Sequence, residues 1–468
     1  MLGDMKSRWA ARAAALAVAA GALFASGPAS ANGRFPASSG IVVHPTDPSF
    51  MLARVTFGLL VSRDAGQTWD WVCEQSVGFS GAEDPMYVIT ANGAIAASTF
   101  SGVARSPAGA CDWSVVGPPL GPQVFIDLAA QPGDAKAFGA FASSYDRQEE
   151  DGGALLFKSV LYESKDEGAT FTQVGTPLDS SLLGETFDFT KDPNRIYVSA
   201  IRGSGEALRG YLLVTNDRGK TWIELPVPLV NGERAPYIAA VDPTDADRLY
   251  VRTANAVDRP SRLLFSSDAG KTWKTIFAGT GALLGFALSP DGKKVYVGGP
   301  GPGPDQAGNP RPSDGVNVAS TTDFVFSRKS DVALQCLHAT NAGLWGCSNE
   351  RSGFVLGVSN DDGATFAPRL TRLCDVRGPL ACAEGTSTAR ECPKQWAQQR
   401  SALGQCDGQP YGSDAGPLDA GGGREAPIDG TFGGYACSAS RGGSFVVLAF
   451  GGLALGLLGL RRARTKRR

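Results

Sequence analysis

One eight-residue pattern constrains the fold of this chain more than any other feature of its sequence. The pattern, here called the box, is [ST]-x-D-x-G-x-T-[WF], and it occurs at Ser62–Trp69, Ser164–Phe171, Thr215–Trp222, Ser266–Trp273 and Ser359–Phe366. Successive boxes begin 102, 51, 51 and 93 residues apart. Because the first and last gaps are near twice 51, each is expected to hold one degenerate copy, Ser106–Trp113 and Ser320–Phe326. The sequence therefore predicts seven repeat units.

Each constrained position of the box has a physical reason. An Asp in a turn can accept hydrogen bonds from nearby backbone N–H groups. The Gly allows a positive φ or a close backbone approach, the Thr returns the chain to extended structure, and the aromatic ring can pack against a neighbouring sheet. We interpret the box as a structural hairpin; the alternative makes the Asp a metal ligand or an acid. The residues concerned are Ser62, Asp64, Gly66, Thr68, Trp69, Ser164, Asp166, Gly168, Thr170, Phe171, Thr215, Asp217, Gly219, Thr221, Trp222, Ser266, Asp268, Gly270, Thr272, Trp273, Ser359, Asp361, Gly363, Thr365 and Phe366.

A second motif, a Pro/Asp turn followed by a strand, precedes the boxes. It begins at His44, Gln131, Lys191, Asp242 and Ser289. Turn residues between aromatic and β-branched segments are typical of strand pairs. One unit then contains four strands joined by this turn, a hairpin and the box, which is the composition of a propeller blade. We therefore predict an all-β fold, a seven-bladed β-propeller at residues 32–372.

The box resembles the Asp-box, or BNR, repeat of sialidase-like β-propellers. The turn and box together also resemble photosystem-assembly-factor-like propellers. This resemblance implies seven blades with the boxes on the outer rim, away from a central site. It is specific for fold and says little about activity, because one fold hosts many functions.

The catalytic motifs of two glycosidase families with propeller folds can be compared with this sequence. Sialidases carry an Arg motif ahead of the first box, and the one candidate here is Gly33-Arg34-Phe35-Pro36, which is out of order. Residues 40–69 look like the opening blade of xyloglucan-cleaving propeller glycosidases, in which Ala-Arg-x precedes a catalytic Asp. Here Ala53-Arg54-Val55 precedes Thr56. A glycosidase needs two carboxylates, so this substitution argues against that activity.

Arg54 and Arg252 occupy equivalent places in their strands and are candidate ligand-binding residues facing the central channel. The alternative is that both arginines are solvated or salt-bridged. His44 and His338 are the two histidines of the chain, and their positions suggest no cluster. Motifs for a nucleophile elbow, a phosphate loop or a metal site are absent from the sequence, so we predict no cofactor and no metal.

The net charge of the chain between its two ends limits the classes of molecule that it is expected to bind. Residues 32–436 hold 34 Lys and Arg against 45 Asp and Glu, a net charge of −11. An acidic body argues against nucleic-acid binding. We expect a non-catalytic module that binds a glycan or a surface protein. A divergent glycoside hydrolase, sialidase-like or glucanase-like, is the first alternative, and an assembly or scaffold factor is the second.

Both ends of the chain resemble targeting signals. Residues 1–31 have a basic start, an apolar core and an A-x-A site, which predicts a signal peptide cleaved after Ala31. Residues 437–468 contain Cys437, an uncharged run at 444–460 and a basic tail, in the order of a MYXO-CTERM-type sorting signal. That resemblance implies a sorting protease acting near Cys437 and an exported protein at the outer cell surface. A retained single-pass membrane anchor at 444–460 is the alternative.

The cysteines suit an oxidising compartment. We expect Cys73 to pair with Cys111 and Cys336 with Cys347, because they are close in sequence. Residues 373–406 form a Cys-rich segment, and its four cysteines permit three pairings among themselves. Residues 407–436 are rich in Gly, Asp and Pro and are predicted to be a flexible spacer. The eight candidates are Cys73, Cys111, Cys336, Cys347, Cys374, Cys382, Cys392 and Cys406.

The sorting signal yields a direct test. Replacing Cys437 with Ala should block processing and leave an uncleaved membrane form, because the apolar run stops transfer and the basic tail does not cross. Deleting residues 437–468 should release soluble propeller. Both results are read by fractionation and intact mass. Wild-type processing of the Cys437→Ala protein would favour the plain membrane anchor instead.

Overall fold

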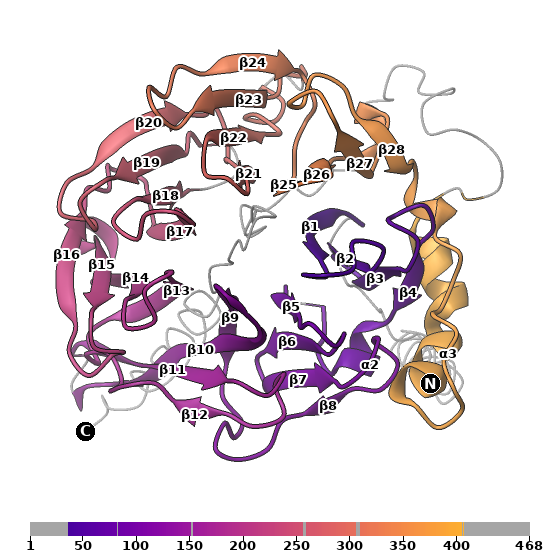
Figure 1. Ribbon diagram of the computed structural model, residues 1–468, viewed down its shortest axis with the longest axis horizontal. Helices are drawn as coiled ribbons and strands as arrows, with labels where there is room; N and C mark the ends of the chain where they lie inside the picture. Colours follow the sequence, from indigo (N-terminus) through magenta and orange to yellow (C-terminus); the bar gives the residue numbers. More distant parts are fainter. Residues whose placement is uncertain are drawn as a thin grey trace, which may run out of the picture. The chain divides into compact units, whose positions relative to one another are not determined.

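The repeat unit folds as a four-stranded antiparallel sheet, or blade, and seven blades follow one another around a ring (Figure 1). Each blade joins four consecutive strands in chain order. The first strand of each blade lies nearest the centre of the ring and the fourth forms the rim. The predicted seven-bladed β-propeller is therefore confirmed, including the blades that contain the two degenerate boxes.

The strands have the following bounds. Blade 1 contains β1 (Ser38–Val43), β2 (Met51–Val55), β3 (Gly58–Ser62) and β4 (Asp70–Val72), and blade 2 contains β5 (Tyr87–Ile89), β6 (Ile95–Thr99), β7 (Gly102–Ser106) and β8 (Ser114–Val115). Blade 3 contains β9 (Phe125–Gln131), β10 (Asp134–Gln148), β11 (Leu155–Ser164) and β12 (Thr172–Gln173), and blade 4 contains β13 (Leu183–Phe189), β14 (Ile196–Arg202), β15 (Arg209–Thr215) and β16 (Ile223–Val227). Blade 5 contains β17 (Ala235–Val241), β18 (Leu249–Ala254), β19 (Arg262–Ser266) and β20 (Lys274–Ala278), and blade 6 contains β21 (Gly285–Leu288), β22 (Lys294–Gly299), β23 (Gly315–Ser320) and β24 (Ser327–Ser330). Blade 7 contains β25 (Cys336–Thr340), β26 (Gly343–Cys347), β27 (Leu356–Ser359) and β28 (Ala367–Leu370).

Helices are few in the part of the chain that the structure describes. They are α2 (Glu74–Val77), α3 (Ser387–Ala402) and the short 3-10 turns η2 (Gly205–Ala207), η3 (Glu350–Ser352) and η4 (Leu373–Asp375). None of these helices is long and apolar enough to cross a membrane.

The computed structural model describes residues 36–81, 83–150, 153–255, 259–305, 309–404 and 406, and structural statements concern these residues. The predicted signal peptide at 1–31, the spacer at 407–436, Cys437 and the apolar run at 444–460 lie outside them.

The antiparallel order gives the ring two different faces. The Pro/Asp turn joins strands one and two of a blade, and the box joins strands three and four, so both lie on one face, here called the box face. The hairpins between strands two and three, together with the connections from blade to blade, lie on the opposite face, here called the hairpin face. On the box face the two turns are hydrogen-bonded, since Ala65 N donates to Ser49 O (3.0 Å) and Ala269 N to Asp247 O (2.9 Å).

The apolar core lies between neighbouring blades rather than at the centre of the ring. One cluster, for example, joins Tyr197 and Leu212 of blade 4 to Ile238 and Leu264 of blade 5, and all four side chains are fully buried. Burial of this apolar surface is the main favourable term that holds the blades together.

The box glycine makes one of these contacts between blades. A Cβ added at Gly270 of blade 5 would lie 2.3 Å from Leu212 Cδ2 of blade 4, and one at Gly363 of blade 7 would lie 2.5 Å from Val316 Cγ1 of blade 6. Both glycines also have positive φ, 87° and 88°. The Gly is therefore required for its backbone conformation and for the approach of the preceding blade.

Residues 373–406, here called the clasp, run from blade 7 back to blades 1 and 2. Figure 1 shows α3 beside β4 on the rim. The disulfides are Cys73–Cys392, Cys111–Cys382, Cys336–Cys347 and Cys374–Cys406. The expected Cys336–Cys347 bond is confirmed, because these residues face each other on β25 and β26.

The expected Cys73–Cys111 bond is wrong. Cys73 follows β4 of blade 1 and Cys111 lies in the degenerate box of blade 2, and each pairs with a cysteine of the clasp. The expectation that the last four cysteines pair among themselves is also wrong, since of these only Cys374 and Cys406 do so. Local sequence spacing failed here because the ring brings residues more than 270 positions apart into contact.

The glycine contact predicts a difference between two Gly→Ala variants. Gly270 and Gly232 both have positive φ, but a Cβ at Gly232 would meet nothing within 4 Å. Both variants carry backbone strain, and Gly270→Ala alone also overpacks the junction of blades 4 and 5. Gly270→Ala should therefore be about 1–3 kcal/mol less stable than Gly232→Ala in urea unfolding. Equal midpoints for the two variants would contradict the proposed role of the box glycine.

Candidate functional site

The box carboxylates are the first candidates for chemistry, because each of the five boxes exposes an Asp near the rim. In the box of blade 5, Asp268 Oδ1 accepts from Ser266 Oγ (2.8 Å) and Thr272 N (2.8 Å), and Oδ2 accepts from Thr272 Oγ1 (2.6 Å). The same three bonds recur in the other four boxes at Asp64, Asp166, Asp217 and Asp361. Their carboxylate oxygens are used to fix the turn.

The electrostatics of the boxes agree with this structural role. The hydroxyl and N–H of Thr272, with Ser266, lower the pKa of Asp268 to about 2, and Asp217 and Asp361 are shifted to about 2 by the equivalent groups. A general acid needs a pKa near the operating pH, so these groups are poor acids. Within the described residues, no group of three or more His, Cys, Asp or Glu side chains is arranged to hold a metal ion.

One feature of the box was missed in the sequence. The residue between the Asp and the Gly also has positive φ in all five boxes, at 57° to 62°. These residues are Ala65, Glu167, Arg218, Ala269 and Asp362. Because the residue type at this position varies, the sequence pattern does not predict the positive φ. The conformation follows from the hydrogen bonds on either side.

The aromatic residue that ends the box is not buried equally in all blades. Trp69 is 1% exposed and its Nε1 donates to Gly66 O (3.0 Å), and Trp113 makes the equivalent bond to Ala110 O (3.0 Å). Trp222 and Trp273 are only partly buried. The expected packing of the ring between sheets is therefore complete in blade 1 and looser in blades 4 and 5.

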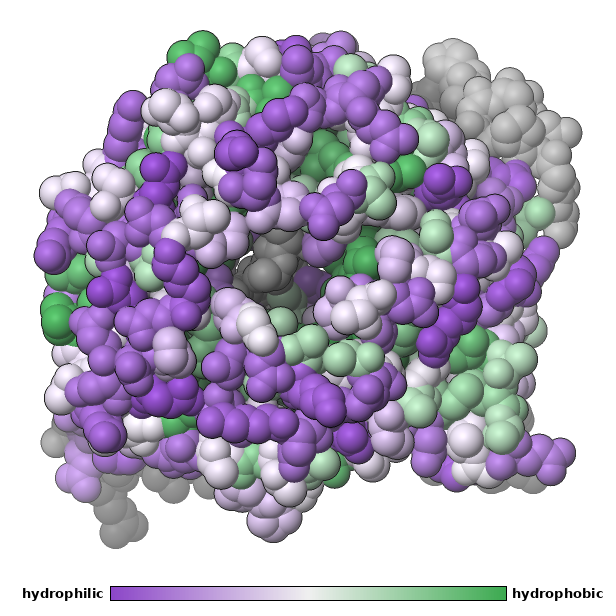
Figure 2. All heavy atoms as spheres, in the orientation of Figure 1, coloured by the Kyte–Doolittle hydropathy of each residue, from purple (hydrophilic) through white to green (hydrophobic). Residues whose placement is uncertain are grey.

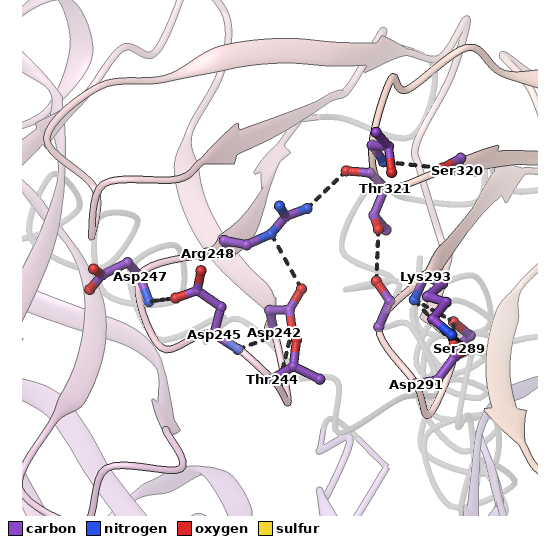
Figure 3. Close-up of polar contacts among 12 residues, drawn as sticks. Asp242, Thr244, Asp245, Asp247, Arg248, Ser289, Asp291, Lys293, Ser320 and Thr321 are labelled. Atoms are coloured by element: carbon purple, nitrogen blue, oxygen red, sulfur yellow. Dashed lines mark hydrogen bonds and ion pairs between the residues drawn. The ribbon is translucent and has the colours of Figure 1, made fainter.

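Figure 3 shows the hydrogen bonds and the ion pair made by the polar side chains in the Pro/Asp turns of blades 5 and 6. Asp242 Oδ1 accepts from Thr244 N (2.8 Å) and Thr244 Oγ1 (2.6 Å), while its Oδ2 lies 3.4 Å from Arg248 Nε. Arg248 Nη2 donates to Thr321 O of blade 6 (2.8 Å). Ser289 Oγ donates to Asp291 Oδ1 (2.6 Å) in the next turn. This group of polar residues closes turns and joins two blades.

Arg54 and Arg252, the candidate ligand-binding residues, lie at equivalent positions on β2 and β18. They are 5% and 3% exposed. Arg54 Nη1 lies 3.1 Å from Met86 Sδ, on the approach to blade 2, and Arg252 Nη1 donates to Leu283 O, on the approach to blade 6. Each guanidinium therefore connects its own blade to the next. Direct contact of these two arginines with a ligand stays a prediction.

The position that carries the catalytic Asp in the resembled glycosidases is closed in this chain. Thr56 is 4% exposed, and its Oγ1 accepts from Ala37 N (3.0 Å). Arg34, the candidate for the sialidase motif, lies outside the described residues. His44 Nδ1 accepts from the backbone N–H groups of Thr46 (3.2 Å) and Asp47 (3.0 Å), so this histidine holds its turn.

The hairpin of blade 3 is the feature that departs most from the repeat. β10 has 15 residues and β11 has 10, whereas the second and third strands of the other blades have four to seven. The added length extends beyond the sheet on the hairpin face. Sequence analysis missed this extension.

The extended part carries exposed apolar side chains. Tyr145 is 41% and Leu155 is 39% exposed. Tyr145 faces Phe157 across the hairpin, and Leu155 lies two residues from Phe157 on β11, so Leu155 and Phe157 project from one face. The extended part is held at one point, because Phe157 N donates to Ser180 O (2.7 Å).

The hairpin carries charged as well as apolar side chains. Figure 2 shows that the visible surface is mostly hydrophilic, with apolar residues in scattered groups. Charged residues flank the apolar ones on the hairpin, where Asp146 pairs with Arg147 (2.5 Å). Phe100, at the neighbouring β6–β7 turn, is also 37% exposed. Two adjacent blades therefore present large apolar side chains on the hairpin face.

No protein-family model matches the chain, and no curated protein matches it. The structure is similar to a GH74 enzyme from Niastella koreensis (16% identity, TM-score 0.41), covering 72% of this chain and 53% of that one. It is also similar to the Hadza microbial sialidase Hz136 (13%, TM-score 0.38; 64% and 72% covered) and to YCF48 bound to D1 peptide (16%, TM-score 0.31; 53% and 71% covered). The chain spans about half the length of the GH74 enzyme, and these similarities concern the fold alone.

The low pKa of the box carboxylates predicts acid sensitivity. An Asp in an unfolded chain has a pKa near 3.9, and the pKa of Asp268 is about 2 in the folded protein. Its ionised form therefore stabilises the fold above about pH 4, and this contribution is lost as pH falls through about 2. Asp268→Asn should lower the urea midpoint at pH 6 and reduce its decline between pH 4 and pH 2.5. An unchanged slope in this variant would show that the carboxylate does not stabilise the turn.

Proposed function

We propose that this protein is an exported β-propeller that binds a surface glycan or a surface protein through its hairpin face, without catalysing a reaction. The single observation that carries the proposal is the braced extension of β10 and β11, which exposes Tyr145 and Leu155. An aromatic ring with an apolar body and a polar tip is suited to a recognition surface. Binding would bury these side chains without refolding, because strand pairing and the Phe157–Ser180 hydrogen bond already hold the extension.

Other observations support a binding role over catalysis. Thr56 occupies the place of a carboxylate, and the box carboxylates are committed to turns near the rim. Four disulfides indicate an oxidising compartment, which supports export. In this proposal the segment 437–468 directs the propeller to the outer cell surface, by processing near Cys437 or by a retained anchor.

A shortened hairpin tests the proposal. Because Ser144 faces Lys158 across the hairpin, residues 145–157 can be replaced by Asn-Gly, which favours a two-residue turn. The variant should keep the unfolding midpoint of wild type and lose at least tenfold in affinity for the glycan or surface protein that wild type selects on arrays. Tyr145→Ser should give a smaller loss.

The matched control is Ile223→Ser, which removes an apolar side chain that is 54% exposed on the rim strand β16. This control should bind like wild type. Unchanged binding by the shortened variant would overturn the role of the hairpin. Turnover of an arrayed glycan by wild type would instead show a hydrolase and overturn the non-catalytic proposal.

A further inference from the structure

The junction of blade 7 with blade 1 differs from every other junction in the ring. Each blade is built from its own four consecutive strands, so the first and last blades share no strand. Successive blades elsewhere are joined by a direct chain connection, and blade 7 has none to blade 1 except through the clasp. Direct polar contacts at this seam include Ser38 Oγ, which donates to Val355 O (3.1 Å) and to Ser348 O (3.4 Å).

An extended segment of the clasp pairs with the outer edge of blade 1, where Pro379 forms a parallel bridge with Trp71. Arg377 N donates to Trp69 O (3.0 Å), Trp71 N to Gly378 O (2.6 Å) and Leu380 N to Trp71 O (2.8 Å). The side chain of Arg377 also forms an ion pair with Asp70. These bonds occupy the rim edge of β4, which would otherwise be open.

The clasp also contributes to the core at the seam. Leu373, Cys392 and Leu403 belong to the apolar cluster that joins blades 7 and 1. The rings of Trp396 and Trp71 lie 5.3 Å apart. The clasp therefore fills the space that would remain between the outer parts of these two blades.

Two disulfides make this closure covalent. Cys392 binds Cys73 beside blade 1, and Cys382 binds Cys111 in the box of blade 2. Near the second bond, Thr388 N donates to Cys111 O (3.0 Å) and Ser387 N to Asp112 Oδ1 (3.0 Å). These disulfides span 319 and 271 residues, which is most of the ring. The Cys374–Cys406 bond lies within the clasp and crosses no blade junction.

We propose that the clasp is a thiol-dependent lock that closes the propeller between blade 7 and blades 1 and 2. A dithiol reductant meets the partly exposed Cys111–Cys382 bond first, and Cys73–Cys392, whose cysteines are fully buried, once the clasp loosens there. Each bond takes up two electrons and two protons. Four cysteine thiols form, and two molecules of the dithiol become disulfides. The seam then opens locally, while blades 3 to 5 stay folded because their junctions keep the direct chain connection and apolar core.

Native-state hydrogen exchange on the full exported chain tests this lock, since it reports local opening separately from global unfolding. The variant combines Cys73→Ser, Cys392→Ser, Cys111→Ser and Cys382→Ser. Protection in β1, β4 and β25 should fall at least tenfold, with β14 and β18 unchanged. The matched control, Cys374→Ser with Cys406→Ser, should keep wild-type protection in β1 and β4. If the fourfold variant does not fold, the same exchange measurement on folded wild type with increasing dithiothreitol replaces it.

Two outcomes would overturn the proposal. Wild-type protection at the seam after loss of both bonds would show that the ring closes without the lock. An equal loss of protection in all seven blades would show that the disulfides stabilise the whole fold and do not control one seam.

Discussion

The structure depends on the hydrogen-bonded turn of the box, because that turn joins the last two strands of a blade and contacts the preceding blade. The Asp fixes the backbone with three hydrogen bonds, as at Asp268. This geometry places two successive residues at positive φ, and the second must be Gly because the preceding blade approaches it. A device of eight residues, repeated from blade to blade, therefore fixes the local hairpin and a contact with the preceding blade.

In a ring built from such units, the chain connects each blade directly to the next at every junction except the one between the last blade and the first. Six junctions follow from the chain connection, and the seventh requires a separate closure. In this protein the closure comes from residues 373–406, which hydrogen-bond to the outer edge of β4, complete an apolar cluster and form disulfides to two blades. On the box face, the carboxylates of Asp242 and Asp268 accept hydrogen bonds within their own turns. These oxygens are therefore used to hold the fold.

The blades differ most in length on the hairpin face, where β10 and β11 extend beyond the other strands. The β10–β11 extension needs no box and is stabilised by strand pairing, so its length can vary without disturbing the ring. Tyr145 and Leu155 are exposed on this hairpin. Their apolar surface stays in contact with water and contributes no burial energy to the fold. The buried Arg54 and Arg252 connect neighbouring blades, and their direct contact with a ligand stays a prediction.

The sequence by itself determined the seven blades, the positions of the boxes and the Cys336–Cys347 bond. These features depend on residues within one repeat, so their chemistry is visible in short stretches. Only the tertiary structure decided that Cys73 pairs with Cys392, that Trp69 is buried where Trp273 is only partly buried, and that α3 packs on β4. The physical reason is ring closure: it brings residues 319 positions apart into contact, and neither composition nor local spacing records which blade meets the end of the chain.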